Sequence, residues 1–174
     1  VAYGIAGPRN PAVLAPRRLE KWIYEKADDV VFTCEGGYDY IVEQGWEGRI
    51  PRAKIHYINN GVDLAVFDEN RARYTVQDPD LEDPSVFKVV YTGSIRKVNH
   101  LGLLLDAAKE VTDPRVKFLI WGDGDQRAAL EQRVREEEIS NVVFKGKVEK
   151  KYIPSIVSRA DINLIHGGDQ GKEL

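Results

Sequence analysis

The sequence predicts an α/β protein with a Rossmann-like, doubly wound parallel sheet and a partial second α/β unit. Short β-branched apolar runs alternate with amphipathic helical segments through the second half of the chain. Helical segments of ten or more residues between strands need crossover connections, which make the strands parallel and place helices on both faces. Glycine-containing turns follow two of these strands, as in sheets that bind ligands at their carboxyl ends.

The composition is that of a globular chain without a long apolar span. The 174 residues are 43% hydrophobic and 30% charged, and no apolar run approaches the roughly 20 residues of a transmembrane helix. A net charge of -3 provides no basic field for binding nucleic acid. The single cysteine and the lack of a basic-then-apolar leader predict a cytoplasmic protein, and peripheral contact with the inner face of a membrane is compatible with this prediction.

The first sixty residues predict the end of one α/β unit. Apolar positions at helical spacing over Arg17–Ala27 predict an amphipathic helix that begins after Pro16, with residues 1–16 as a loop. The next predicted elements are a buried strand over Val30–Thr33, a helix through Tyr38, Ile41 and Val42, and a strand over Ile55–Ile58. We assign residues 1–60 to a first domain.

An acidic stretch with two prolines follows this unit. Residues 77–85 combine charge and proline, which predicts a solvated loop. Residues 61–85 are therefore interpreted as an interdomain segment with an acidic loop, and residues 86–174 as a second domain.

The second domain alternates strands and helices regularly. The predicted strands are Val86–Thr92, Val116–Trp121, Val142–Phe144 and Asp161–Ile165. The predicted helices are Leu101–Val111, Gln126–Glu138 and Tyr152–Arg159. Ligands of such sheets bind at the carboxyl ends of the strands, which here are the loops 93–99, 122–125, 145–149 and 166 onward.

The loop after the first of these strands has the features of an anion site. Gly93 allows a sharp turn, the N–H groups that follow can point at an anion near the helix start, and Arg96 and Lys97 add charge. A diphosphate would fit this arrangement. An ordinary strand-to-helix turn with two solvated basic residues is the competing interpretation.

The loop Gly122-Asp123-Gly124-Asp125-Gln126-Arg127 partly matches a dinucleotide fingerprint. Arg127 stands where a third glycine is usual, and Lys145-Gly146-Lys147 follows the next strand in place of an acidic ribose ligand. These differences disfavour NAD, whereas NADP stays an alternative because a basic residue suits a 2′-phosphate. A plain tight turn also explains the two glycines.

The sequence shows no pattern typical of a metal site or a catalytic nucleophile. His56, His100 and His166 are scattered and have no paired cysteines, so no metal is predicted. Cys34 has no identifiable catalytic partner and is interpreted as a small buried hydrophobe. A patch of basic residues forms either a solvated loop or one side of the ligand cleft: Lys145, Lys147, Lys150 and Lys151.

Several segments recur in an order and spacing found in one enzyme family. In the second domain they are Val90–Ser94, Leu104–Lys109, Ile120–Gly124, Asn141–Gly146 and Arg159–Leu164. In the first part of the chain they are Glu25–Thr33 and Ile58–Asp63 with Phe67. Together these segments resemble the retaining GT-B glycosyltransferases of group 1 or family 4, which use nucleotide sugars. The resemblance covers nearly the whole chain. It implies that residues 1–60 are the C-terminal part of an acceptor-side domain and that residues 86–174 are a truncated domain that binds the donor nucleotide sugar.

The resemblance implies roles for particular residues. The donor diphosphate would be bound by Gly93, Ser94, Arg96, Lys97 and Asn99, and the nucleoside by Gly122, Gly124, Lys147 and Val148. Ser94 stands where many members have arginine, and Asn99-His100 where they have Lys-Gly, so Arg96 or Lys97 would supply the charge. The family's E-x7-E carboxylate pair is expected beyond the last residue, so no catalytic residue is assigned.

The resemblance also implies an activity. The intact protein would transfer a hexose from a nucleoside diphosphate sugar to a glycan or lipid-linked acceptor in surface polysaccharide assembly. It would need no cofactor or metal, because basic side chains and N–H groups stabilise the leaving diphosphate. The chain as given is expected to be inactive. The alternatives are a nucleotide-sugar epimerase of the same fold and a non-catalytic nucleotide-binding domain.

Overall fold

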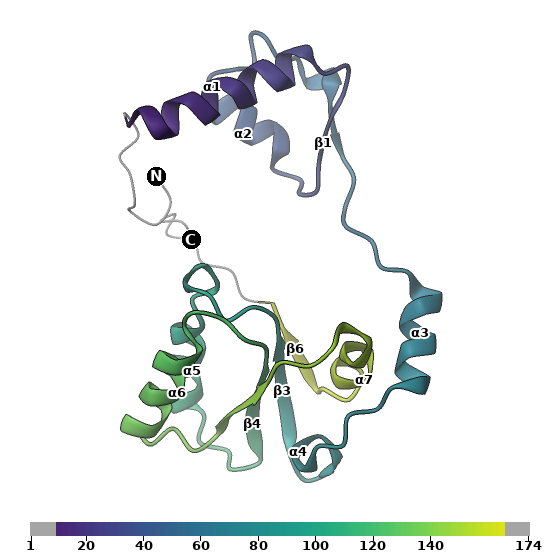
Figure 1. The fold of residues 1–174 in the computed structure, drawn as a ribbon, viewed down its shortest axis with the longest axis vertical. Helices are drawn as coiled ribbons and strands as arrows, with labels where there is room; N and C mark the ends of the chain where they lie inside the picture. The colour runs from purple at the N-terminus through teal and green to yellow at the C-terminus, as the bar shows by residue number, and fades with distance from the viewer. Residues whose placement is uncertain (1–9, 166–174) are drawn as a thin grey trace. The chain divides into compact units, whose positions relative to one another are not determined.

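The computed structural model describes residues 10–165 and divides the chain into two compact units (Figure 1). Unit 1 is Val1–Val62 and unit 2 is Asp63–Leu174. This division places residues 63–85 in the second unit, whereas the sequence suggested an interdomain segment there. Each unit has its own hydrophobic core.

Unit 1 combines helices with one pair of parallel strands. Its elements are α1 (Pro11–Lys26), β1 (Val30–Phe32), α2 (Gly37–Glu43), the 3-10 turn η1 (Arg52–Lys54) and β2 (Ile55–Tyr57). Ile41, Trp46 and Ile50 form the core, and the rings of Tyr24 and Phe32 pack against it. The predicted order of helix, strand, helix and strand is therefore present.

Helix α1 begins at Pro11, so the prediction of a loop up to Pro16 is wrong. The Asn10 side chain accepts a hydrogen bond from the N–H of Ala12 at 2.9 Å, and Pro11 occupies the first helical position, where no N–H is needed. Pro16 lies inside the helix and costs it one backbone hydrogen bond. The remaining part of the predicted loop, residues 1–9, lies outside the described residues.

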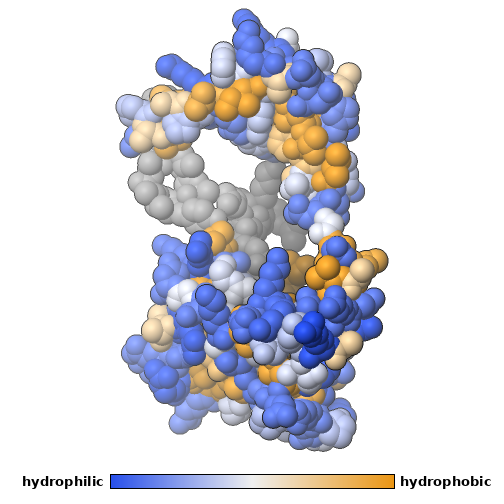
Figure 2. Space-filling model, turned by 45° about the vertical axis from the view of Figure 1, so that its right-hand side comes forward, coloured by the Kyte–Doolittle hydropathy of each residue, from blue (hydrophilic) through white to orange (hydrophobic). Residues whose placement is uncertain are grey.

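Unit 1 leaves several apolar side chains in contact with solvent. Leu19, Trp22 and Ile23 on α1 are each about half exposed, and Val31 of β1 is 52% exposed. Figure 2 shows hydrophobic surface over this unit. Strand β1 is thus buried on one side only, and the predicted burial of Cys34 is wrong because this residue is exposed.

Unit 2 is built around a four-stranded parallel sheet in the order β5-β4-β3-β6. Its strands are β3 (Phe87–Thr92), β4 (Val116–Trp121), β5 (Val142–Gly146) and β6 (Ile162–Leu164). Its helices are α3 (Leu64–Arg73), α4 (Pro79–Glu82), α5 (Leu101–Glu110), α6 (Arg127–Glu136) and α7 (Ile153–Val157), with 3-10 turns η2 (Lys97–Asn99) and η3 (Lys150–Tyr152). The chain runs outward from β3 to β5 and then returns to place β6 on the other side of β3.

Helices cover both faces of this sheet. Neighbouring residues of a strand point to opposite faces, so each strand contributes to two cores. Val89 and Tyr91 of β3 belong to one core, which includes Leu105 of α5. Val90, between them, belongs to a second core with Leu81 of α4 and other residues of α7 and β4. The doubly wound fold predicted from the sequence is confirmed.

The acidic stretch 77–85 is folded, so its prediction as a solvated loop is wrong. It contains α4, whose first turn is capped by the carboxylate of Asp78, and Leu81 is only 4% exposed. The Lys145 Nζ lies 2.7 Å from a carboxylate oxygen of Asp78 and 2.6 Å from one of Asp80, and Asp80 also pairs with Lys117 at 2.5 Å. These lysines lie on β5 and β4, so the acidic segment is attached to the sheet.

Helix α3 lies in the region interpreted from the sequence as an interdomain segment. Asp63 caps it by accepting a hydrogen bond from the N–H of Val66 at 3.1 Å. Ion pairs at helical spacing follow, such as Asp68 with Arg71 at 3.0 Å. The capping aspartate and the charge spacing were both visible in the sequence and would have predicted this helix.

We expect limited proteolysis to cut first within residues 59–62, because these residues are exposed and belong to no helix or strand. Residues 77–85 should resist, since Leu81 is buried and the neighbouring carboxylates are paired. Mass spectrometry of the early products should find a stable fragment beginning near Asp63. A first cut within residues 77–85 would contradict the packing of α4.

Candidate functional site

A cavity of about 450 Å³ lies at the carboxyl ends of β3, β4 and β5. Three successive loops line it, together with the end of β4 and the start of α7: Gly93, Ser94, Trp121, Gly122, Asp123, Lys147, Val148, Glu149, Lys150 and Ile153. Five of the residues predicted to bind the donor are brought together here: Gly93, Ser94, Gly122, Lys147 and Val148. The carboxyl edge is where sheets of this topology bind ligands.

Backbone hydrogen bonds join the loops that form the cavity. They run from Gly93 N to Trp121 O (3.0 Å), from Ile95 N to Asp123 O (2.9 Å) and from Gly122 N to Gly146 O (2.9 Å). These bonds tie the three loops to one another at the carboxyl edge of the sheet.

Two glycines of the second loop are required by close backbone approach. A Cβ at Gly122 would lie 1.8 Å from the carbonyl oxygen of Gly93, and the φ of Gly122 is +153°. A Cβ at Gly124 would lie 2.2 Å from the carbonyl oxygen of Ile95. Both glycines therefore have a structural reason, as the tight-turn interpretation proposed, and of the two only Gly122 also lines the cavity.

Tyr91 supports the first loop from the end of β3. Its hydroxyl donates a hydrogen bond to the carbonyl oxygen of Ser94 at 2.9 Å, and burial raises the pKa of the Tyr91 phenol, so it remains a donor at neutral pH. The Ser94 hydroxyl donates to the side-chain oxygen of Asn99 at 3.3 Å. Asn99 thus contacts a cavity residue without lining the cavity itself.

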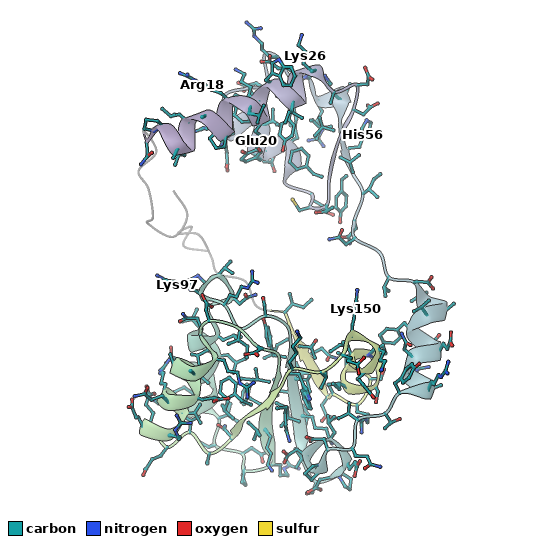
Figure 3. All side chains as sticks on the ribbon, in the orientation of Figure 1. Arg18, Glu20, Lys26, His56, Lys97 and Lys150 are labelled. Atoms are coloured by element: carbon teal, nitrogen blue, oxygen red, sulfur yellow. The ribbon has the colours of Figure 1, made fainter. Side chains whose placement is uncertain are left out.

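The structure places Arg96 and Lys97 away from this cavity. Both line a second cavity, of about 320 Å³, with residues of α5 and α6. Ile95 is fully buried in the core beside α5 and fixes the chain direction, so the residues after it turn toward the helices. Figure 3 shows Lys97 on the loop above α5 and Lys150 beside α7.

The four lysines of the basic patch divide into two pairs. Lys147 and Lys150 line the cavity, and neither forms an ion pair with a carboxylate of residues 10–165. Lys145 is bound by carboxylates of the α4 segment, and Lys151 pairs with Glu149 at 3.0 Å. The free positive charge at the cavity therefore comes from Lys147 and Lys150.

Other lining residues were not singled out from the sequence as ligand-binding residues, among them Trp121, Glu149 and Ile153. An aromatic residue that ends a strand directly before a glycine was the available signal for Trp121. Within residues 10–165 no three His, Cys, Asp or Glu residues gather as a possible metal site, and no helix of this range is long and apolar enough to cross a membrane. His166 and the loop after β6 lie outside the described residues.

The strand order and the position of the cavity define a class of protein. A doubly wound parallel sheet with a cavity at its carboxyl edge is the Rossmann-like architecture. Residues 86–166 match the family model of the group 1 glycosyl transferases. The match agrees with the resemblance to GT-B glycosyltransferases noted from the sequence of these residues.

Solved structures show the same GT-B fold. Anabaena HepE in complex with UDP has a TM-score of 0.65 at 17% identity, over 91% of this chain and 43% of that chain. TarM of S. aureus has a TM-score of 0.59 at 20% identity, over 84% and 27%. The pneumococcal O-GlcNAc transferase GtfA in complex with UDP and GlcNAc has a TM-score of 0.51 at 16% identity, over 82% and 26%.

The chain spans between about a quarter and less than half of these solved proteins. No sequence among the curated proteins matches it significantly. At identities of 16–20% these solved structures establish the fold of the chain and not its activity or substrates.

Proposed function

We propose that the chain is part of a retaining glycosyltransferase that transfers a hexose from a nucleoside diphosphate sugar to a glycan or lipid-linked acceptor. The surface polysaccharide role belongs to the same proposal. The observation that carries it is the cavity at the ends of β3, β4 and β5, inside the segment that matches the group 1 family. The solved HepE and GtfA structures were determined with UDP, which makes UDP the first nucleotide to test.

The lining of the cavity is suited to such a donor. Lys147, which the resemblance assigned to the nucleoside, would here neutralise the diphosphate together with Lys150, since charge-assisted hydrogen bonds to phosphate are among the strong ones. Val148 and Ile153 provide apolar surface against which a base can pack.

No metal or other cofactor is part of this proposal. Fixed positive charge stabilises a leaving diphosphate as a metal would, and the two lysines of the cavity supply that charge. We also place the protein in the cytoplasm, at or near the inner face of the membrane, where a lipid-linked acceptor would be available. The single cysteine of the chain supports a reducing compartment.

Lys147→Ala is expected to weaken UDP binding about tenfold or more, because a hydrogen bond to a charged group contributes about 1.5–3 kcal/mol. Isothermal titration calorimetry with UDP, GDP and ADP measures the dissociation constants. Lys109→Ala is the matched control: Lys109 is an exposed lysine paired with Glu137 at 2.9 Å and lies outside the cavity lining, so its loss should leave binding unchanged.

Equal dissociation constants for the two variants would remove Lys147 from the site. Failure of the unchanged chain to bind any nucleoside diphosphate would overturn the proposed function. Transfer of labelled hexose from the preferred donor to an acceptor, assayed with the full-length protein, distinguishes a transferase from an epimerase or a non-catalytic nucleotide-binding domain.

A further inference from the structure

A small aromatic and cationic stack lies next to the cavity without lining it. Tyr74, the residue that follows α3, makes an edge-to-face contact with Tyr152, with ring centroids 5.9 Å apart at 71°. The Lys151 Nζ lies 5.2 Å from the centroid of the Tyr74 ring and 5.3 Å from that of Tyr152. Both tyrosines are half-buried. The three side chains form one contact, which we call the Tyr74 stack.

The Tyr74 stack is connected to the cavity through turn η3. Two residues of this turn belong to the stack, and the third lines the cavity. Turn η3 consists of Lys150, Lys151 and Tyr152, and Lys150 lines the cavity. Glu149, also in the lining, pairs with Lys151 at 3.0 Å and accepts a backbone hydrogen bond from Tyr152 N at 3.0 Å. The direction of Lys150 is therefore set by a turn that Tyr74 contacts.

Tyr74 itself is held in place by the chain that follows it. Two residues further on, the carbonyl oxygen of Val76 accepts a hydrogen bond from the Arg159 guanidinium at 2.8 Å. The Val76 side chain packs against the same core as Val148 and Ile153, which line the cavity. Helix α3 also packs against α7 and η3. The ring is thus a fixed support for the turn.

We propose that Tyr74 is a positioning residue for donor binding: its ring holds η3 so that Lys150 faces the nucleoside diphosphate. The inference rests on the proposed function, because it assumes that the cavity binds such a ligand. Tyr74 does not touch the ligand and acts only through η3. A lysine on a fixed turn binds an anion more tightly than one on a mobile turn, because less backbone entropy is lost on binding.

The test compares UDP binding by three variants at a temperature where each is folded. Tyr74→Ala should weaken binding about three- to tenfold, which is the range expected from losing an aromatic pair and a cation–π contact. Tyr74→Phe keeps the ring that contacts Tyr152 and Lys151, so this variant should bind UDP with a dissociation constant within about twofold of that of the unchanged chain. Arg73→Ala is the control for UDP affinity. The guanidinium carbon of Arg73 lies 5.4 Å from the centroid of the Tyr74 ring, but Arg73 is not part of η3.

A double-mutant cycle separates positioning from general stability. Tyr74 acts through Lys150, so Tyr74→Ala should add no further loss of UDP affinity in a Lys150→Ala background. A ring with a merely structural role would give losses that multiply. If Tyr74→Ala does not fold, Tyr74→Leu keeps apolar bulk at the position and enters the same cycle.

Multiplied losses, or UDP binding by folded Tyr74→Ala within twofold of the unchanged chain, would overturn the positioning role and leave the proposed function standing. A chain that binds no nucleoside diphosphate at all would overturn both. The two failures are therefore distinguishable from one set of titrations.

Discussion

Gly122→Ala is expected to lower the free energy of unfolding of unit 2 by about 4 kcal/mol or more, which is exceptional for one added methyl group. The new Cβ would lie 1.8 Å from the carbonyl oxygen of Gly93, and a φ of +153° is strained for any L side chain. To make room, the first two loops must separate. That movement breaks the backbone hydrogen bonds from Gly93 to Trp121 and from Ile95 to Asp123.

Amide hydrogen exchange in β3 and β4 measures this loss, because it reports on unit 2 alone. Gly102→Ala is the matched control within the same unit. Gly102 lies in α5, and the nearest heavy atom to a Cβ there is Arg133 Nη1 at 3.5 Å, an ordinary contact. Alanine should be neutral or stabilise the helix by up to about 1 kcal/mol. Equal exchange in the two variants would contradict the close approach of the loops.

Lys145→Met is expected to destabilise unit 2 by about 3 kcal/mol, because it leaves two largely buried carboxylates without their shared cation. The side chains of Lys145, Asp78 and Asp80 are only 11%, 12% and 15% exposed. After the substitution Asp80 keeps its pair with Lys117, whereas Asp78 has no ion-pair partner among the described residues. Methionine has a similar length, so the effect reports the lost charge more than a lost volume.

The same cluster makes the stability of unit 2 depend on pH in a defined direction. Burial alone would raise the pKa of Asp80, but hydrogen bonds from Lys117 and Lys145 outweigh it and hold the pKa below its ordinary value of 3.8. This contribution is therefore present above pH 3.8 and is lost as the pH falls through the lowered pKa. Burial would lower the pKa of Lys145, but Asp78 and Asp80 raise it above 10.5, so that contribution is lost only as the pH rises through the raised pKa.

Urea unfolding at several pH values checks both statements. The stability difference between the unchanged chain and Lys145→Met should be largest near neutral pH and should shrink below pH 3.8. Lys109→Met removes an exposed pair, with side chains 44% and 31% exposed, and should cost less than about 1 kcal/mol. A Lys145→Met variant as stable as this control would show that the α4 attachment is not electrostatic.

The sheet of unit 2 could be predicted because its strands carry local signals. The apolar runs of β3 and β4 are buried on both faces, and glycine follows each strand where the loops approach one another. The parallel direction of the strands then follows from the length of the helical connections, whereas their order in the sheet was not predicted. The carboxyl edge as the site of the cavity follows from the topology in the same way.

Other features depend on partners distant in the sequence. Residues 77–85 have the composition of a loop, and the lysines that neutralise their acids lie on β4 and β5. The start of α1 is a different, local case: Pro16 was interpreted as the helix start, whereas the stronger signal was Asn10 before Pro11.

The roles of Arg96 and Lys97 could not be predicted from spacing alone. Both residues follow the glycine turn closely enough for a diphosphate contact, but the burial of Ile95 turns the chain toward α5 and α6. Which side chain becomes buried depends on the whole core. The assignment of Arg96, Lys97 and Asn99 to the diphosphate stays a prediction, and Lys147 and Lys150 are the cations that line the described cavity.

The position of Trp121 makes the cavity accessible to fluorescence measurements. Its ring is 2% exposed and contributes to the cavity wall, with the Lys145 ammonium 6.0 Å from the ring centroid. The other two tryptophans, Trp22 and Trp46, belong to unit 1. A base that enters the cavity changes the surroundings of the Trp121 indole, so its emission at fixed protein concentration follows occupancy, and the same ring reports when the sheet of unit 2 opens to water.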